Sequence, residues 1–126
     1  MSIVLHLMPA LEWHRLGDGE PVSNPSLARE GFIHCTDEPH VMLQVANAYY
    51  ATQPGDFVVI EVDVDLLSSR CVWEDPAHVV GSGESFAPRF PHIYGPIDRG
   101  AVVAVVPVIR DETGRFTGYR TEPPST

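Results

Sequence analysis

The stretch Glu30–Ala51, EGFIHCTDEPHVMLQVANAYYA, contains the change of pattern that decides the fold. Its first part, Phe32–Thr36, is a short apolar run that predicts a strand, and Gly31 before it suits the end of a short helix. Its second part, from about Glu38 to Ala51, carries apolar residues at helical spacing, and Asp37 is suited to cap it. The stretch therefore predicts a strand followed directly by the main helix.

Most of the other segments predict strands. These are Ile3–Met8, Phe57–Val64, Arg70–Glu74, Ala101–Arg110 and Arg115–Arg120, with Phe90–Pro96 as a further short extended segment. Ala10–Leu16 and Asn24–Gly31 predict short helices, the second capped by Asn24. Five or six strands with one main helix, without regular alternation of strand and helix, predict an α+β fold dominated by antiparallel pairing. The chain has no G-x-G-x-x-G and no P-loop, which excludes nucleotide binding by those two devices.

Length and composition predict one globular domain. The chain has 126 residues, of which 44% are apolar, so we expect a single domain over residues 1–126 with a frayed tail from about residue 121. No apolar run reaches the roughly 18 residues of a membrane span, and the N-terminus lacks the basic start of a secretory signal. We therefore expect a cytoplasmic protein. Cys35 and Cys71 have no C-x-x-C partner, and we interpret them as buried thiols.

The charge balance limits the partners. Eight arginines and no lysine stand against 17 acidic residues, for a net charge of −9. Binding to a nucleic acid duplex depends on clustered cations, and these arginines are scattered, so we expect no duplex and no membrane as a partner. A small anionic ligand is compatible with this charge, because one or two local arginines and backbone N–H groups can hold a phosphate. The pattern does not indicate an oligomeric state.

Three histidines, His6, His34 and His92, lie in or beside apolar strand segments. One such histidine is more often a structural core residue than a catalyst, but three together favour a functional cluster. Their type suits acid–base chemistry near neutral pH, because the ordinary pKa of histidine is about 6.5.

Strand alternation predicts which side chains act together, because residues two apart share a face of a strand. Thr36 therefore shares a face with His34, whereas Cys35 points the other way, which argues against a Cys–His nucleophile pair. By the same rule, His92 and Tyr94 share a face.

Further polar residues precede His92. Trp73 offers a stacking surface beside the carboxylate of Glu74, and Arg89 lies three residues before His92, so that an anion clamp can form. The alternative is that Arg89 is a solvated loop residue neutralised by Glu74. The intervening Val79–Pro88 is the longest stretch without periodicity, and we interpret it as a mobile loop that can act as a lid.

The order of the motifs resembles a family. Leu5-His6-Leu7, Trp13, Glu30–Thr36, Trp73-Glu74 and Phe90–Pro96 together resemble a bacterial family known as domain of unknown function 952, over the chain from Ile3 to about Pro107. The fold of that family is similar to that of ADP-ribosyltransferases and the RNA 2′-phosphotransferase group. The resemblance implies an ADP-ribosyltransferase-like split sheet, antiparallel or mixed, with one main helix and short helices, and NAD or an ADP-ribose-like molecule as the ligand.

The resemblance also assigns roles. His6 matches the first-strand histidine that contacts a ribose in those enzymes. Gly31–His34 matches the strand that leads to a tyrosine stacked on nicotinamide, but here Ile33 or His34 stands at that place. The catalytic glutamate of the transferases has no clear equivalent.

These observations lead to one favoured hypothesis and two alternatives. The favoured one is a cleft for a nucleotide-derived or phosphorylated small molecule, with glycosyl or phosphoryl transfer as the reaction if the protein is an enzyme. Its catalytic candidates are His6, His34 and His92, and its substrate-binding candidates are Thr36, Trp73, Glu74, Arg89 and Tyr94. The alternatives are a non-catalytic interaction module with a satisfied polar network, and a three-histidine zinc centre.

Overall fold

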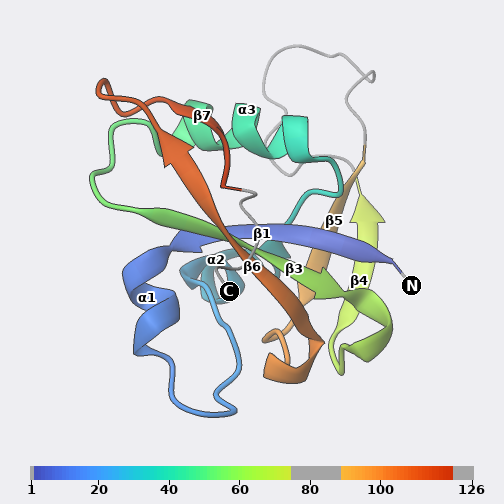
Figure 1. The fold of residues 1–126 in the computed structure, drawn as a ribbon. Helices are drawn as coiled ribbons and strands as arrows, with labels where there is room; N and C mark the ends of the chain where they lie inside the picture. The colour runs from blue at the N-terminus through green and yellow to red at the C-terminus, as the bar shows by residue number, and fades with distance from the viewer. Residues whose placement is uncertain (1, 75–88, 121–126) are drawn as a thin grey trace.

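The computed structural model describes residues 2–74 and 89–120 (Figure 1). In chain order the elements are β1 (Ile3–Pro9), α1 (Ala10–Arg15), α2 (Pro25–Glu30), β2 (Ile33–His34), α3 (Pro39–Tyr49), β3 (Phe57–Asp63), the 3-10 helix η1 (Val64–Leu66), β4 (Arg70–Glu74), β5 (Phe90–Tyr94), the 3-10 helix η2 (Arg99–Ala101), β6 (Val102–Arg110) and β7 (Phe116–Tyr119). The loop predicted over residues 79–88 and the tail from residue 121 lie outside the described residues.

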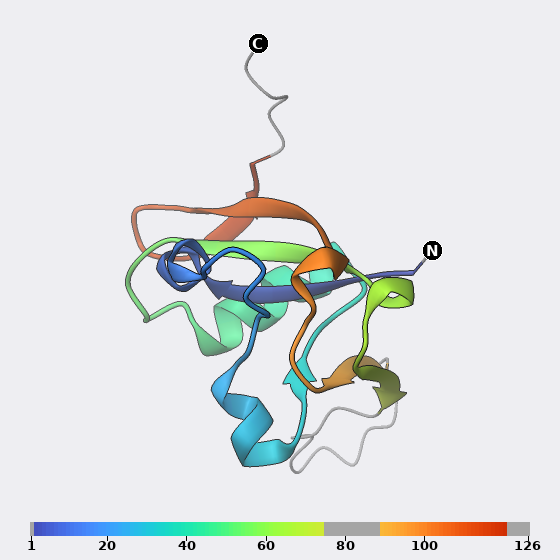
Figure 2. The same cartoon turned by 90° about the horizontal axis from the view of Figure 1, so that it is seen from below.

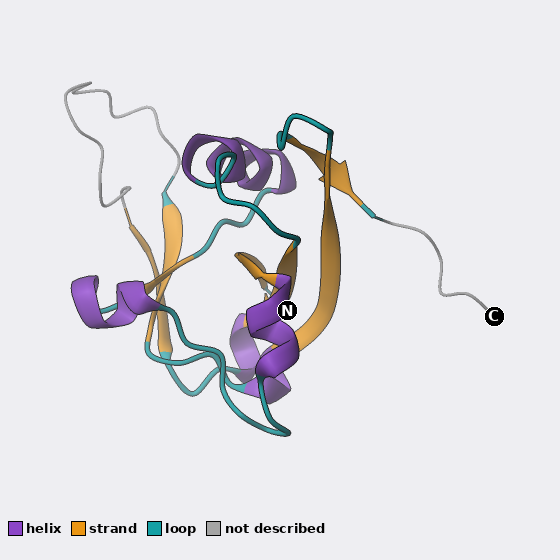
Figure 3. Ribbon diagram, turned by 90° about the vertical axis from the view of Figure 1, so that its left-hand side faces the viewer, coloured by secondary structure: helices purple, strands orange, loops and turns teal. Residues whose placement is uncertain are grey.

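The strands of the described part of the chain form two antiparallel sheets. The larger has the order β1-β3-β6-β7 and the smaller has the order β2-β5-β4. The two sheets stand on opposite sides of the molecule, and the larger one is curled (Figure 3). Figure 2 shows α2 and the smaller sheet together on one side of the long strands. The predicted α+β fold with antiparallel pairing, one main helix and short helices is confirmed.

Local hydrogen bonds explain where two helices begin. The Asn24 side chain accepts from the backbone N–H of Ser26 at 2.8 Å and caps α2, as predicted. The prediction that Asp37 caps the main helix is wrong, because the Glu38 side chain accepts from the backbone N–H of His40. Asp37 instead accepts a hydrogen bond from the indole Nε1 of Trp73 at 3.0 Å. This contact joins the start of α3 to β4.

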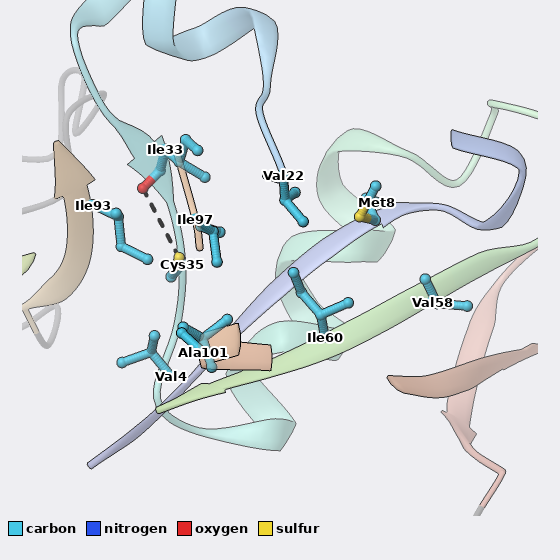
Figure 4. Close-up of a cluster of buried hydrophobic side chains, with 11 residues drawn as sticks. Val4, Met8, Val22, Ile33, Cys35, Val58, Ile60, Ile93, Ile97 and Ala101 are labelled. Carbon is cyan, nitrogen blue, oxygen red and sulfur yellow. Dashed lines mark hydrogen bonds between the residues drawn. The ribbon is translucent and has the colours of Figure 1, made fainter. Parts of the chain in front are cut away.

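Most of the buried apolar side chains lie between the two sheets. Figure 4 shows this cluster, in which Val4 and Ile60 of the larger sheet lie near Ile33 and Ile93 of the smaller sheet. Cys35 belongs to the cluster, and burial raises the pKa of its thiol well above the ordinary value. A second cluster lies between α3 and the larger sheet and includes Leu5, Leu7, Met42, Ala46, Phe57, Val59, Val108 and Phe116. The buried reading of Cys35 is thereby confirmed, while Cys71 is only half-buried.

The strand predicted over residues 32–36 is shorter in the structure. Only Ile33 and His34 pair with β5, because the chain then turns to the edge of the larger sheet. There Leu5 and Thr36 exchange two backbone hydrogen bonds, of 2.6 and 2.9 Å. This pair of residues joins the end of the β2 segment to β1.

The acidic residue at the end of β3, Asp63, is buried. Asp63 is 8% exposed, and its carboxylate accepts from the backbone N–H of Asp65 at 3.0 Å. It caps η1 instead of facing water, which explains why an acid follows an apolar strand at this point.

Candidate functional site

A cavity of about 530 Å³ lies where β1, α2, β2, α3 and β5 meet. We call it the histidine cavity, because the three histidines predicted to cluster all line it. Its lining residues are His6, Leu7, Asn24, Ser26, Arg29, Glu30, His34, Cys35, Thr36, Met42, Val45, Tyr49, Tyr50, Phe90 and His92. A volume of this size suits a small-molecule ligand.

Strand pairing brings the histidines together. His34 and His92 stand directly opposite each other in the β2–β5 register, with ring centroids 5.3 Å apart. The ring of Phe32 stacks on His92 at 4.1 Å and meets His34 edge-on at 4.9 Å. The Leu5–Thr36 bridge brings β1, and with it the buried His6, beside the same segment. The cluster thus depends on pairings between distant parts of the chain.

Hydrogen bonds assign the protonation of the two buried histidines. His6 Nδ1 lies 2.9 Å from the backbone carbonyl oxygen of His34. A carbonyl can only accept, so Nδ1 carries the hydrogen and Nε2 has a free lone pair when the ring is neutral. His92 Nδ1 lies 2.8 Å from Glu74 Oε1, and the same reasoning leaves its Nε2 as an acceptor. Burial lowers the pKa of His6, which favours the neutral ring.

Three buried polar atoms of the cavity residues have no hydrogen-bond partner among the described residues. They are Nε2 of His6, Nε2 of His92 and Oγ1 of Thr36. Leaving such an atom unpaired costs about 1–3 kcal/mol, so folded proteins usually pair it with protein, water or a ligand. The unpaired atoms therefore mark the part of the cavity that can bind a partner molecule.

Glu74 accepts two hydrogen bonds on one oxygen. Besides His92, the hydroxyl of Tyr94 donates to Glu74 Oε1 at 2.6 Å. The bond from Tyr94, followed by that from His92, lowers the pKa of Glu74, and the same bond to Glu74 raises the pKa of Tyr94. Glu74 is therefore a carboxylate at neutral pH. The prediction that His92 and Tyr94 share a face is confirmed by their common partner.

His34 differs from the two buried histidines. Its side chain is 43% exposed, and its Nε2 lies 2.5 Å from Glu30 Oε2. Glu30 is the last residue of α2, and Gly31 follows it with φ +88°, a left-handed conformation that favours glycine. This turn brings the helix end and β2 together, so that the carboxylate meets the ring.

Some predicted site residues lie outside the lining. Trp73 contacts Asp37. Glu74 binds Nδ1 of His92, and Tyr94 binds Glu74. Arg89 is exposed and directly precedes β5, and the arginine that lines the cavity is Arg29 of α2.

Sequence reasoning missed Arg29 and Glu30 as site residues. Glu30 belongs to the same motif as His34 and Arg29 directly precedes that motif, but their side chains line the cavity because α2 packs against β2.

The arrangement of the three histidines bears on the alternative of a zinc centre. Among residues 2–74 and 89–120, no group of three or more His, Cys, Asp or Glu side chains is arranged to hold a metal ion. Nε2 of His34 is paired with Glu30 Oε2, whereas the partners of His6 and His92 lie at Nδ1. In the same part of the chain, no helix has the length and apolar character needed to span a membrane.

The fold and cavity define a small α+β protein whose cavity is lined by two buried histidines and one half-exposed histidine, and comparisons with known proteins give its family. The model of a protein of unknown function, DUF952, matches residues 7–105, and the chain belongs to this family. The predicted resemblance is confirmed at this level. A search of the curated proteins found no match.

Solved structures share the fold. The X-ray crystal structure of protein CC0527 from Caulobacter crescentus is 20% identical, with a TM-score of 0.67, and the match covers 92% of this chain and 94% of that chain. A double mutant of CC0527 matches at 19% identity with the same TM-score and coverage. At this identity the likeness extends to the fold alone.

Proposed function

We propose that the histidine cavity binds a nucleotide-derived or phosphorylated sugar, whose hydroxyl groups donate hydrogen bonds to His6 and His92. The observation that carries this proposal is the set of three unpartnered polar atoms within the described part of the cavity lining. Two are imidazole nitrogens that can only accept when neutral, and one is a hydroxyl that can both donate and accept. A ligand that satisfies them must present at least two donors close together, as the hydroxyls of a sugar do.

The phosphate group of such a ligand needs a positive charge, and α2 supplies one. Arg29 lines the same cavity, and a guanidinium binds phosphate oxygens in a fork geometry. A sugar phosphate therefore fits better than inorganic phosphate, because phosphate alone offers mainly acceptors to the two imidazole acceptors. Arg29 takes the anion-binding role that the sequence assigned to Arg89.

The arrangement supports an ADP-ribosyltransferase-like interpretation of the split sheets. Two antiparallel sheets face each other, and His6 stands on the first strand with an acceptor free for a ribose hydroxyl. NAD and ADP-ribose are accordingly the first nucleotide ligands of interest. The reaction class that we propose is glycosyl or phosphoryl transfer, with a histidine as the acid or base.

Nuclear magnetic resonance titration of the labelled protein tests this function. The probes are ADP-ribose, NAD, ribose 5-phosphate and the matched 2-deoxyribose 5-phosphate, with inorganic phosphate as the anion control. We expect saturable shifts at residues 32–36 and at His92, with ribose 5-phosphate binding more tightly than its deoxy analogue. His6→Ala should weaken binding about tenfold, the effect of one hydrogen bond to a buried group. His14→Ala, on the exposed surface of α1, should not change it.

Two results would overturn the proposal. One is the absence of saturable shifts with all of the sugar ligands, and the other is equal binding of inorganic phosphate and ribose 5-phosphate. If the sugars do not bind but His6→Ala and His92→Ala strongly destabilise the fold, the cluster is a structural network, as in the interaction-module alternative.

A further inference from the structure

We infer that Glu74 is a positioning residue that makes His92 the proton acceptor of the histidine cavity. Glu74 holds the hydrogen of His92 on Nδ1, so that the lone pair of Nε2 is free for a ligand hydroxyl. This inference rests on the proposed function, because it names the residue pair that acts on the bound sugar. The sequence had placed Glu74 among the ligand-binding side chains instead.

The register of β4 and β5 brings Glu74 and His92 together. In the β4–β5 ladder, Val72 stands opposite His92 and Glu74 stands opposite Phe90, so Glu74 is the diagonal neighbour of His92 on the same face. Diagonal neighbours are within reach of long side chains. The carboxylate thus meets Nδ1 at 2.8 Å.

The ring of His92 is fixed on two sides. Phe32 stacks on it with 4.1 Å between centroids and 20° between planes, while Glu74 holds Nδ1. The residue is 2% exposed. A 180° turn of the ring about its Cβ–Cγ bond would break the bond to Glu74, because the carbon Cδ2 would take the place of Nδ1. The structure therefore favours one tautomer and one orientation.

Tyr94 keeps the carboxylate charged. Its hydroxyl donates to the same Oε1 as His92, which stabilises the ionised form of Glu74 and lowers its pKa. When a ligand hydroxyl transfers its proton to Nε2, the O–H electron pair stays on the oxygen and the ring becomes an imidazolium. The neighbouring carboxylate balances that new positive charge.

His6 is less suited to the same role. Its Nδ1 faces a neutral carbonyl instead of a carboxylate, and burial lowers its pKa. A proton on His6 would have no opposite charge at Nδ1. His6 therefore orients a hydroxyl by accepting a hydrogen bond, whereas His92 with Glu74 can remove a proton.

The tautomer of His92 tests the inference. A purely structural role of Glu74 does not predict that this tautomer depends on the Glu74 carboxylate. Long-range ¹H–¹⁵N spectra of the intact protein distinguish protonated from unprotonated ring nitrogens. We expect His92 to carry its hydrogen on Nδ1 in the wild type. In Glu74→Gln the amide can donate as well as accept, so the ratio of the tautomers should change by about tenfold toward Nε2–H.

Two control variants show whether the change of tautomer is specific to the Glu74–His92 pair. Glu30→Gln removes the corresponding carboxylate beside His34 and should leave the His92 tautomer unchanged. Tyr94→Phe keeps Glu74 in place, so His92 should keep its hydrogen on Nδ1. A wild-type His92 protonated on Nε2 overturns the inference without the need for a variant. An unchanged tautomer in folded Glu74→Gln also overturns it.

Titration with ribose 5-phosphate links the pair to the ligand. We expect the His92 Nε2 resonance to shift on binding in the wild type, and to shift less in Glu74→Gln. Failure of the sugar to bind the wild type refutes the proposed function, and with it the role of the pair. Binding without any response at His92 Nε2 refutes the inference while leaving the binding site intact.

Discussion

The side-chain amide of Asn47 forms two hydrogen bonds with the backbone of Phe116. Nδ2 donates to the Phe116 carbonyl oxygen at 2.9 Å, and the Phe116 N–H donates to Oδ1 at 2.7 Å. The amide therefore pairs with β7 as a neighbouring strand would, and it attaches α3 to the edge of the larger sheet. Because α3 forms one wall of the histidine cavity, this contact also fixes the position of that wall.

Asn47→Ala should lower the free energy of unfolding by about 1–3 kcal/mol, because it leaves both backbone groups of Phe116 without their partner. Gln44→Ala, at an exposed position of the same helix, is the control and should have little effect. Urea denaturation measures both. Equal effects of the two substitutions would contradict this role of Asn47.

The buried His6 should make the stability depend on pH. Its pKa is lower in the folded state than the ordinary value of 6.5, so the unfolded chain binds the proton first as the pH falls. The contribution of the neutral ring is complete above pH about 6.5 and is lost as the pH falls from there toward the folded pKa. In urea denaturation between pH 8 and pH 5, the free energy of unfolding should fall less steeply with falling pH for His6→Gln than for the wild type. His14→Gln, at an exposed position, should keep the wild-type slope.

Arg110 binds the loop after α3. Its guanidinium donates to the carbonyl oxygens of Ala51, Gln53, Gly55 and Gly114 at 2.6–2.9 Å and lies 4.3 Å from the centre of the Phe116 ring. A lysine ammonium has three donors and no planar fork. Arg110→Lys should therefore cost about 2 kcal/mol, measured by urea denaturation. A cost as small as that of Arg115→Lys on the exposed turn would show that the fork geometry is unimportant.

A side chain at position 95 would collide with Ser69 and strain the backbone. Gly95 has φ +152°, and an added Cβ would lie 2.3 Å from Ser69 Oγ. Gly95→Ala should lower the unfolding free energy by about 1–3 kcal/mol, as expected for backbone strain. Gly100→Ala is the matched control, since a Cβ there meets nothing within 4 Å. Thermal unfolding compares the two, and equal melting temperatures would contradict the expected clash.

The sequence predicted the elements better than the contacts between them. Alternation and caps gave β1, β3, β4 and the Asn24-capped helix, because these depend on neighbouring residues. The predicted N-cap of α3 was wrong by one residue: Glu38 caps the helix, and the Asp37 carboxylate binds Trp73, 36 positions away. Local patterns cannot predict a competitor so distant in the chain.

The candidate site was predicted by residue type but not by geometry. His6, His34 and His92 do line one cavity, as expected from their strand positions. The pairing of Glu74 with His92 could not be predicted, because it depends on the diagonal register of β4 and β5. The replacement of Arg89 by Arg29 in the lining likewise depends on how α2 folds against β2.

The two buried histidines differ in their robustness to mutation. The hydrogen of His6 is held by the main chain of residue 34, which every amino acid supplies, so substitution of the His34 ring leaves that acceptor in place. The hydrogen of His92 is held by a side chain, and a single codon change at position 74 removes its partner. Evolution can therefore alter the reactivity of one histidine of the cavity by one substitution while the other keeps its orientation.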